Sequence, residues 1–177
     1  MAFNLVYKQY GERSILIEWP SSIDKKILFD VLSFKNNILN SSVEFIVDMN
    51  NAYNSLLITY GKNIINFDES VSRLKKIYKQ EESFTESVFK LWKIPVCYDD
   101  EFGIDLEVMS SSKNMSKKFI VNQHSKANYT VYFIGFLPGF LYLGGLDNAL
   151  HFPRKETPRS KIEKGAVAIG GNQTGIY

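Results

Sequence analysis

The sequence predicts an α+β protein in two parts, a small α+β N-terminal domain over residues 1–84 and a β-rich domain over residues 85–177. Hydrophobic residues in the first half recur at helix and strand spacings. Of the 11 glycines, two precede residue 100 and eight follow residue 130, so tight turns gather in the second half. Residues 81–86 are polar and without periodicity, which favours a domain boundary there.

The first elements expected are two strands, over residues 5–7 and 14–19, separated by a turn at Gly11. Ser21 or Ser22 could cap a helix that starts near residue 23. The apolar face of this helix would be formed by Ile23, Ile27, Leu28, Val31 and Phe34.

The rest of the first half predicts two further strands and a second helix. Residues 43–48 alternate between apolar and polar, as a half-buried strand does. A strand over residues 55–60 ends at Gly61, and an amphipathic helix follows around residues 71–78. Two helices packed on one face of a mostly antiparallel sheet is the expected architecture.

The second half predicts short elements joined by glycine- and proline-bearing loops. We expect a strand over residues 88–98, irregular at Pro95, and short helices over residues 105–109 and 116–124. Asn114 is a possible cap of the second of these helices. Strands over residues 129–134 and 165–170 complete the set, which is typical of a β-barrel or sandwich.

Composition excludes several classes of function. The chain has 177 residues and a formal net charge of +2, with no basic footprint for nucleic acid. It has no apolar run long enough to span a bilayer, no charge stripe for a membrane surface and no secretory signal at its N-terminus. Cys97 is the single cysteine, so no internal disulfide can form. We therefore expect a cytoplasmic protein that binds neither nucleic acid nor membrane.

Residues 135–145 are expected to form a loop with a turn at Pro138-Gly139. The aromatic side chains of Phe136, Phe140 and Tyr142 could line an apolar pocket, or they could close the end of a barrel. The segment lacks the Gly-Lys-Ser/Thr of a phosphate-binding P-loop.

Two Pro-Arg pairs stand within residues 153–159 and present Arg154 and Arg159. Proline stiffens the backbone before each guanidinium, whose planar fork suits a carboxylate or a phosphate. This pattern indicates an anion-binding loop. Two alternatives remain open: a solvated basic loop, or arginines bound to acidic partners within the fold, of which Glu101 is one candidate.

Residues 170–177 place Asn172, Gln173 and Thr174 between glycines after a strand. Such a loop can orient a small polar ligand, or it can be a plain hairpin. His124, at the end of a predicted helix, can titrate near neutral pH, although a lone histidine is more often structural. No second His, Cys or carboxylate stands at metal-ligand spacing, so no metal site is expected.

Several motifs occur in a fixed order. Residues 135–147 read G-F-L-P-G-F-L-Y-L-G-G-L-D, residues 153–159 read P-R-K-E-T-P-R, and residues 173–177 read Q-T-G-I-Y. Upstream, residues 94–98 read I-P-V-C-Y and residues 101–106 read E-F-G-I-D-L. Together they resemble the motifs of the family formed by the B subunit of 5-oxoprolinase (PxpB), also called the KipI or allophanate hydrolase subunit 1 family. His124-Ser125 matches the H-S of that family.

The sequence departs from the family pattern at a few places. Residues 162–165 read I-E-K-G where the family often has V-P-A-G, Ala166 replaces a frequent Ser, and Asp48 replaces a frequent Pro. Members usually continue beyond the residue that matches Tyr177, with further strands. The barrel is therefore expected to be incomplete as given.

The resemblance implies a cyclophilin-like β-barrel in the second domain, related to modules of urea amidolyase carboxyltransferase domains. It implies a bacterial subunit of an enzyme that opens 5-oxoproline to glutamate with ATP, and that does not turn over substrate alone. ATP would be used by the complex, with no cofactor bound directly by this chain. The partners would be the other 5-oxoprolinase subunits, PxpA-like and PxpC-like.

The resemblance and the residue chemistry together nominate a site on the barrel. The catalytic candidates are His124, Arg154 and Arg159. The candidates for binding a small ligand or an anion in a groove are Phe136, Pro138, Tyr142, Gln173 and Thr174. The alternative is a KipI-type inhibitor of a histidine kinase, for which exposed aromatic side chains such as Phe140 and Tyr142 would anchor the interface.

Overall fold

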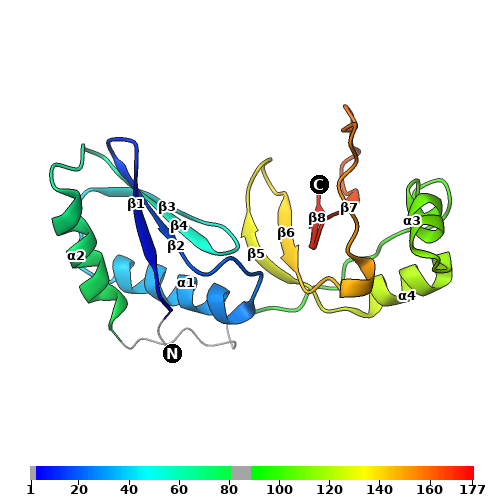
Figure 1. The fold of residues 1–177 in the computed structure, drawn as a ribbon, viewed down its shortest axis with the longest axis horizontal. Helices are drawn as coiled ribbons and strands as arrows, with labels where there is room; N and C mark the ends of the chain where they lie inside the picture. The colour runs from blue at the N-terminus through cyan, green and yellow to red at the C-terminus, as the bar shows by residue number, and fades with distance from the viewer. Residues whose placement is uncertain (1–2, 81–88) are drawn as a thin grey trace. The chain divides into compact units, whose positions relative to one another are not determined.

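The computed structural model describes residues 3–80 and 89–177 (Figure 1). It divides the chain into two compact units, Met1–Phe89 and Lys90–Tyr177. The boundary expected between residues 84 and 85 lies outside the described residues.

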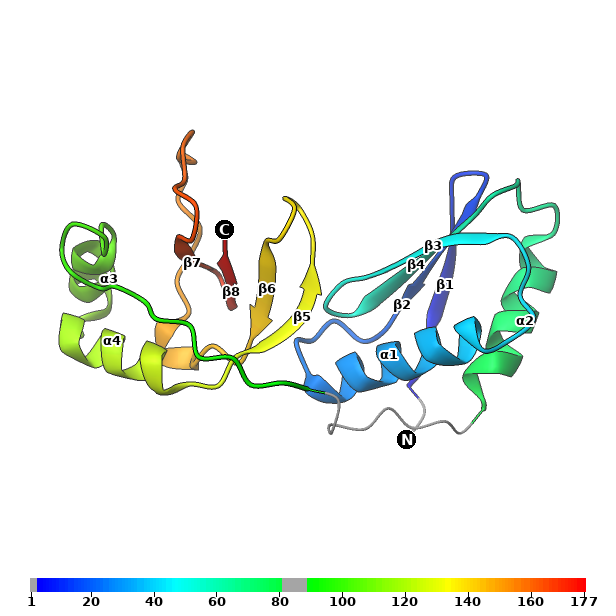
Figure 2. The same cartoon turned by 180° about the vertical axis from the view of Figure 1, so that it is seen from behind.

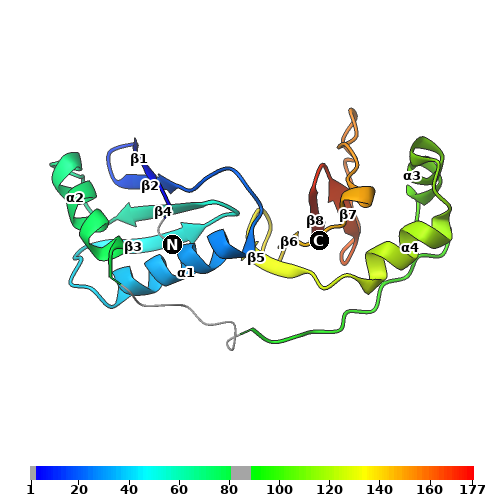
Figure 3. The same ribbon diagram turned by 60° about the horizontal axis from the view of Figure 1, so that its bottom comes forward.

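The first unit is a four-stranded antiparallel sheet in the order β1-β2-β4-β3, with two helices (Figures 1 and 3). Its elements are β1 (Val6–Tyr10), β2 (Ser14–Glu18), α1 (Lys25–Leu39), β3 (Ile46–Asn51), β4 (Ser55–Tyr60) and α2 (Phe67–Tyr78). In the register Ile15 pairs with Ile58 and Ile17 with Leu56, and all four side chains are buried. They pack with buried residues of both helices in one core. The predicted arrangement of two helices on one face of the sheet is confirmed.

Helix α1 begins two residues later than predicted, and its cap is Asp24. The Asp24 backbone is extended, and its carboxylate accepts a hydrogen bond of 2.8 Å from the backbone N–H of Lys26. The prediction that Ser21 or Ser22 caps this helix is therefore wrong. Aspartate caps helices as well as serine does, and Asp24 stands directly before the first turn.

The alternation predicted over residues 43–48 is wrong because β3 is bulged. Phe45 has a positive φ of 66°, and its carbonyl accepts a hydrogen bond from the Gly61 N–H. The pairing with β4 shifts register between Ile46 and Asp48, which leaves the Val47 side chain 65% exposed. A bulge reverses the faces of the residues on either side of it, so a simple period of two fails here.

The second unit contains two helices, four strands and one short 3₁₀ helix. These elements are α3 (Leu106–Lys113), α4 (Lys117–Lys126), β5 (Thr130–Ile134), β6 (Leu141–Gly144), η2 (Asn148–Leu150), β7 (Val167–Gly170) and β8 (Gln173–Ile176). The strands form an antiparallel sheet in the order β5-β6-β8-β7 (Figure 2). Over residues 89–177 this sheet is open, so the α+β class is confirmed while a closed barrel is not observed.

Two expectations for the second unit are corrected. Residues 135–145 are not only a loop, because they contain β6, whereas residues 170–177 form most of the β7–β8 hairpin, which is the alternative that the sequence left open. Residues 89–98 form no strand, and Trp92 there is 77% exposed. A segment with a proline and without a neighbouring strand lacks the hydrogen bonds that define one.

The two predicted helices of this unit are present, but Asn114 has a different role. It ends α3 in a left-handed conformation, with φ 52°. The cap of α4 is Ser116, whose hydroxyl accepts a 3.1 Å hydrogen bond from the Phe119 N–H. Asparagine tolerates the left-handed conformation that often follows a helix.

The core formed by the helices of the second unit meets its sheet at β7. A core cluster contains Met109 of α3, Ile120 of α4 and Leu150 of η2, and Ile169 of β7 packs against it. Ile169 pairs with Thr174, and successive residues of a strand point to opposite faces. Thr174 therefore points to the same face as Ile169, and its neighbours Gln173 and Gly175 point to the opposite one.

Among the helices that the structure describes, none has the length and apolar character that crossing a membrane requires.

Candidate functional site

An aromatic row lies on the sheet face opposite the one that carries Ile169 and Thr174. Tyr142 pairs with Gly175 in the register, and its ring stacks on Phe133 at 4.0 Å between centroids. Phe140 contacts Tyr142 and Tyr177 edge to face, each at 4.7 Å. Such edge-to-face and stacked pairs are favourable ring geometries. The row provides an apolar wall along this face.

The three candidates in the β5–β6 turn differ in exposure. Phe140 is buried, with 8% of its surface exposed, whereas Phe136 is 73% exposed and has a positive φ of 62°. Pro138 is exposed in the turn. Two backbone hydrogen bonds close this turn, one from the Gly135 N–H to the Phe140 carbonyl and one from the Phe140 N–H to the Leu137 carbonyl. Phe140 therefore belongs to the interior of the row, and Phe136 with Pro138 forms its solvent-facing tip.

The Gly175 position explains how the row approaches β8. A Cβ atom at Gly175 would lie 2.4 Å from Cζ of Phe140 and 2.9 Å from the carbonyl oxygen of Leu141. No side chain fits there. The ring of Phe140 thus rests directly on the β8 backbone, two residues from Gln173.

Arg154 lies against the neighbouring part of the same hairpin. Its Nε is 3.0 Å from where a Cβ of Gly170 would stand, and its terminal nitrogen donates to Oε1 of Gln173 at 3.5 Å. Gly170 and Gln173 are paired residues of β7 and β8. The structure therefore brings together Arg154 and Gln173, two residues predicted from separate motifs.

Arg154 and Gln173 together can donate hydrogen bonds to a ligand. A guanidinium has donors only, so the Gln173 side chain must turn its oxygen toward Arg154 and its NH₂ group away. The 3.5 Å contact is at the long limit for a hydrogen bond and neutralises no charge. Arg154 is exposed, and none of the ion pairs found among the described residues includes it.

Arg159 has a different environment, because its guanidinium group is bound to Asp105. Its two terminal nitrogens donate to the two carboxylate oxygens of Asp105 at 2.5 and 2.7 Å, and Lys155 lies 2.7 Å from the same carboxylate. The hydrogen bonds from Arg159 lower the pKa of Asp105 to about 2. Of the alternatives left open by the sequence, an arginine bound to an acidic partner describes Arg159, and that partner is Asp105 rather than Glu101.

His124 is buried in α4. Its Nδ1 lies 2.6 Å from the hydroxyl of Tyr98, and its backbone carbonyl accepts a 3.0 Å hydrogen bond from Tyr129. Burial lowers the pKa of His124, raises the pKa of Tyr98, and is the main cause that raises the pKa of Tyr129 to about 12. These groups are neutral near pH 7, and they join α4 to the segments on either side of it.

Thr174 lies on the sheet face that carries Ile169. It is 3% exposed, and its hydroxyl donates to the carbonyl of Ala168 at 2.9 Å. The structure thus places Thr174 away from the face that carries Gln173, and His124 in α4.

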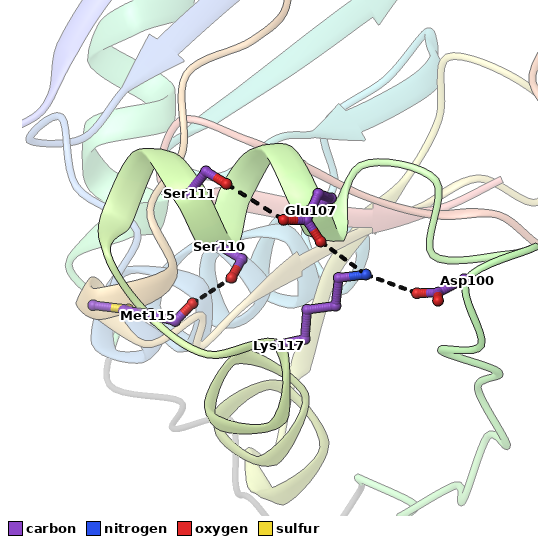
Figure 4. A network of polar contacts seen from close by, with 6 residues as sticks. All are labelled: Asp100, Glu107, Ser110, Ser111, Met115 and Lys117. Carbon is purple, nitrogen blue, oxygen red and sulfur yellow. Dashed lines mark hydrogen bonds and ion pairs between the residues drawn. The ribbon is translucent and has the colours of Figure 1, made fainter.

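A polar network secures the helical part of the second unit (Figure 4). Lys117 of α4 reaches Asp100 at 2.8 Å and Glu107 of α3 at 3.0 Å, and the Ser110 hydroxyl donates to the carbonyl of Met115. Sequence reasoning missed these contacts and the role of Asp105. The available signal was the E-F-G-I-D-L motif, which ends at the start of α3.

The first unit contains a pocket of about 380 Å³ beside α2. Its lining includes Phe45, Lys62, Tyr60 and Arg73, and none of the site residues predicted from the sequence. Lys62 lies over the Phe45 ring at 3.3 Å, which gives this cation a partner within the fold.

The chain thus consists of two antiparallel sheets packed with helices, and one face of the second sheet carries aromatic side chains and Gln173 beside Arg154. Residues 5–177 match the family model described as carboxyltransferase domain, subdomain C and D. The chain belongs to this family, which includes the B subunit of 5-oxoprolinase and allophanate hydrolase subunit 1.

Two curated relatives carry the name of the B subunit of 5-oxoprolinase. The protein of Haemophilus influenzae is 39% identical over 135 residues, which are 76% of this chain and 61% of that protein. The protein of Escherichia coli O157:H7 is 40% identical over 109 residues, which are 62% of this chain and 50% of that protein. The chain thus spans about half to three fifths of these relatives.

A solved structure extends the likeness in fold. The urea carboxylase of Kluyveromyces lactis matches 99% of this chain and 18% of its own length, with a TM-score of 0.76 and 18% sequence identity.

Proposed function

We propose that this chain acts as the B subunit of an ATP-dependent 5-oxoprolinase complex that converts 5-oxoproline to glutamate. The names of the curated relatives support this proposal. In it, the open face of the second sheet binds the substrate or an anionic intermediate derived from it, and catalysis requires the other subunits.

The pairing of Arg154 with Gln173 is the observation that carries the proposal. 5-Oxoproline has a carboxylate and a lactam carbonyl on a small, nearly flat ring. The Arg154 fork suits the carboxylate, and the outward NH₂ group of Gln173 can donate to the carbonyl. Tyr142 and the rest of the aromatic row supply an apolar wall, and Phe136 with Pro138 forms the rim of the proposed groove.

The remaining candidates receive supporting roles. Arg159 holds the loop through Asp105, Thr174 fixes the β7–β8 hairpin, and His124 secures α4. We further propose that the sheet is part of a cyclophilin-like barrel, and that ATP is bound by PxpA-like or PxpC-like partners rather than by this chain.

The kinase-inhibitor alternative gains no support from the described residues. It requires aromatic anchors at the surface, yet Phe140 is buried and Tyr142 is half-buried against Phe133. Phe136 is exposed, as are Trp92 and Phe102 of the same unit, but exposed apolar side chains are common on protein surfaces and do not by themselves identify a partner.

Reconstitution with the two partner subunits tests the proposal. ATP-dependent release of glutamate from 5-oxoproline is measured for the wild type, for Arg154→Gln and for the control Lys164→Gln, which removes one exposed positive charge from the same loop region. A lost hydrogen bond to a charged group raises KM about 10- to 100-fold, so Arg154→Gln should do so while Lys164→Gln leaves KM unchanged.

Two outcomes would contradict the proposal separately. Wild-type kinetics of Arg154→Gln would remove this face from substrate binding. An absence of glutamate release with any pair of partner subunits, or recovery of a histidine kinase in a pull-down instead of those subunits, would reject the enzyme complex.

A further inference from the structure

Asp105 connects two parts of the loop that carries Arg154. Its Oδ1 lies 2.7 Å from Nζ of Lys155 and accepts a 2.7 Å hydrogen bond from Arg159, while Oδ2 accepts the second bond from the Arg159 fork at 2.5 Å. Lys155 directly follows Arg154 in the chain, and Arg159 lies at the far end of the motif. One carboxylate therefore attaches the 153–159 motif near both of its ends.

The loop has few other attachments near the ligand-binding cation. Residues 153–165 are exposed and form no helix or strand. An unrestrained loop samples many conformations, and ordering it costs free energy for every residue that is fixed. Pro153 and Pro158 reduce this freedom, and the Asp105 contacts select one conformation from those that remain.

The position of Asp105 is itself well defined. It stands directly before α3, at the N-cap position of that helix, and Lys117 couples α3 to α4 through Glu107 (Figure 4). A carboxylate near the N-terminus of a helix is also favoured by the helix dipole. The attachment point is thus carried by a helix pair rather than by another loop.

The ion pairs of Asp105 distinguish Arg154 from its two neighbouring cations. Within residues 153–159 the cations are Arg154, Lys155 and Arg159, and Asp105 pairs with Lys155 and Arg159. Of these three, Arg154 is the one left for a ligand, and it is held against bare backbone at Gly170 and beside Gln173. Without Asp105, three neighbouring cations would repel one another and compete for the same ligand carboxylate.

We propose that Asp105 is the positioning residue of the site: by binding Lys155 and Arg159 it places Arg154 where it receives the carboxylate of the ligand. Asp105 itself touches no ligand. This inference rests on the proposed function, since it assigns the part of the chain that orders the same site.

The test uses the reconstituted complex and 5-oxoproline. Asp105→Asn keeps the shape and removes the charge, and it should raise KM about fivefold with kcat within about twofold of the wild type. Asp105→Glu keeps the carboxylate and should restore most of the affinity. Asp100→Asn is the matched control, because it removes the same group from the Lys117 network and should leave KM unchanged.

A double variant separates positioning from general stability. If Asp105 acts through Arg154, adding Asp105→Asn to Arg154→Gln should cause no further rise in KM. A further rise of the same fivefold size would overturn the inference, and so would a wild-type KM for Asp105→Asn. Should Asp105→Asn fail to fold, Lys155→Gln removes one attachment only, and the same two criteria apply to it.

Failure of the proposed function gives a different pattern. An unchanged KM in Arg154→Gln itself would reject the site, whereas a large effect of Arg154→Gln with none from Asp105→Asn or Lys155→Gln would reject only the positioning role.

Discussion

Replacing Gly175 by alanine should destabilise the second unit strongly. The new Cβ would lie 2.4 Å from Cζ and 3.0 Å from Cε1 of Phe140, and 2.9 Å from the backbone oxygen of Leu141. Phe140 cannot withdraw freely, since Tyr142 and Tyr177 pack against its ring. Overpacking of this kind costs about 1–3 kcal/mol, and the backbone contact favours the upper end.

This cost can be read from thermal unfolding. For a unit of this size about 1 kcal/mol shifts Tm by about 4–8 °C, so Gly175→Ala should lower Tm by about 10–20 °C. Near-ultraviolet circular dichroism follows the tyrosine and phenylalanine rings of the row. Gly135→Ala is the matched control: its nearest contact would be 3.7 Å, so its effect should stay below about 1 kcal/mol.

A second substitution identifies the cause. Phe140→Leu removes the two ring atoms that clash, so Gly175→Ala should cost about 1–2 kcal/mol less in that background. The reasoning is refuted if Gly175→Ala melts within about 2 °C of Gly135→Ala, or if Phe140→Leu brings no relief.

Three further predictions concern pH and capping. The folded-state pKa of Asp105 is lowered from 3.8 to about 2, so its stabilising contribution should be complete above about pH 4 and lost as the pH falls to about 2. When the free energy of unfolding is measured over this pH range, Asp105→Asn should lose less stability than the wild type. Burial lowers the pKa of His124, so the unfolded chain binds more protons below the ordinary value of 6.5, and stability should fall as the pH drops below it; a His124→Gln variant with the same slope would contradict this. Ser116→Ala removes the cap of α4 and should cost about 1 kcal/mol in denaturant unfolding, with Ser116→Asp close to wild type.

The sequence predicted the first unit well because its hydrophobic periods are long and regular. The strand over residues 55–60 and the helix that contains Val71 and Leu74 are present as expected. Where the pattern failed, a local feature overrode it: the bulge after Ile46 reversed the faces of β3, and the Asp24 carboxylate competed with two serines for the helix start. Neither event leaves a periodic signal.

The second unit was harder to predict because its strands depend on distant partners. Strands β6 and β8 have four residues each and contain glycine, so local preference favours a loop. They become strands because Leu141 pairs with Ile176 and Tyr142 with Gly175. A sheet contact of this kind is a property of the folded chain and not of either segment.

The site shows the same division between motif and geometry. Separate motifs nominated Arg154 and Gln173, and the structure brings them together. The partner of Arg159 was not predictable, since Asp105 lies 54 positions away and no local pattern links the two. Residue type located the cations, while only the fold distinguishes the one in an ion pair from the one beside an amide.

The contact between Arg154 and Gly170 offers a way to vary reach without varying charge. The guanidinium Nε and Cγ lie 3.0 and 3.1 Å from the place of a Cβ, so a methyl group there would lift the arginine by a few tenths of an ångström. Alanine and then serine in place of Gly170 would displace the Arg154 side chain by increasing amounts and leave its charge unchanged. The affinities of ligands whose carboxylates project to different depths could then be compared across these variants. The variant that binds a ligand best would indicate how far the carboxylate of that ligand reaches toward Arg154.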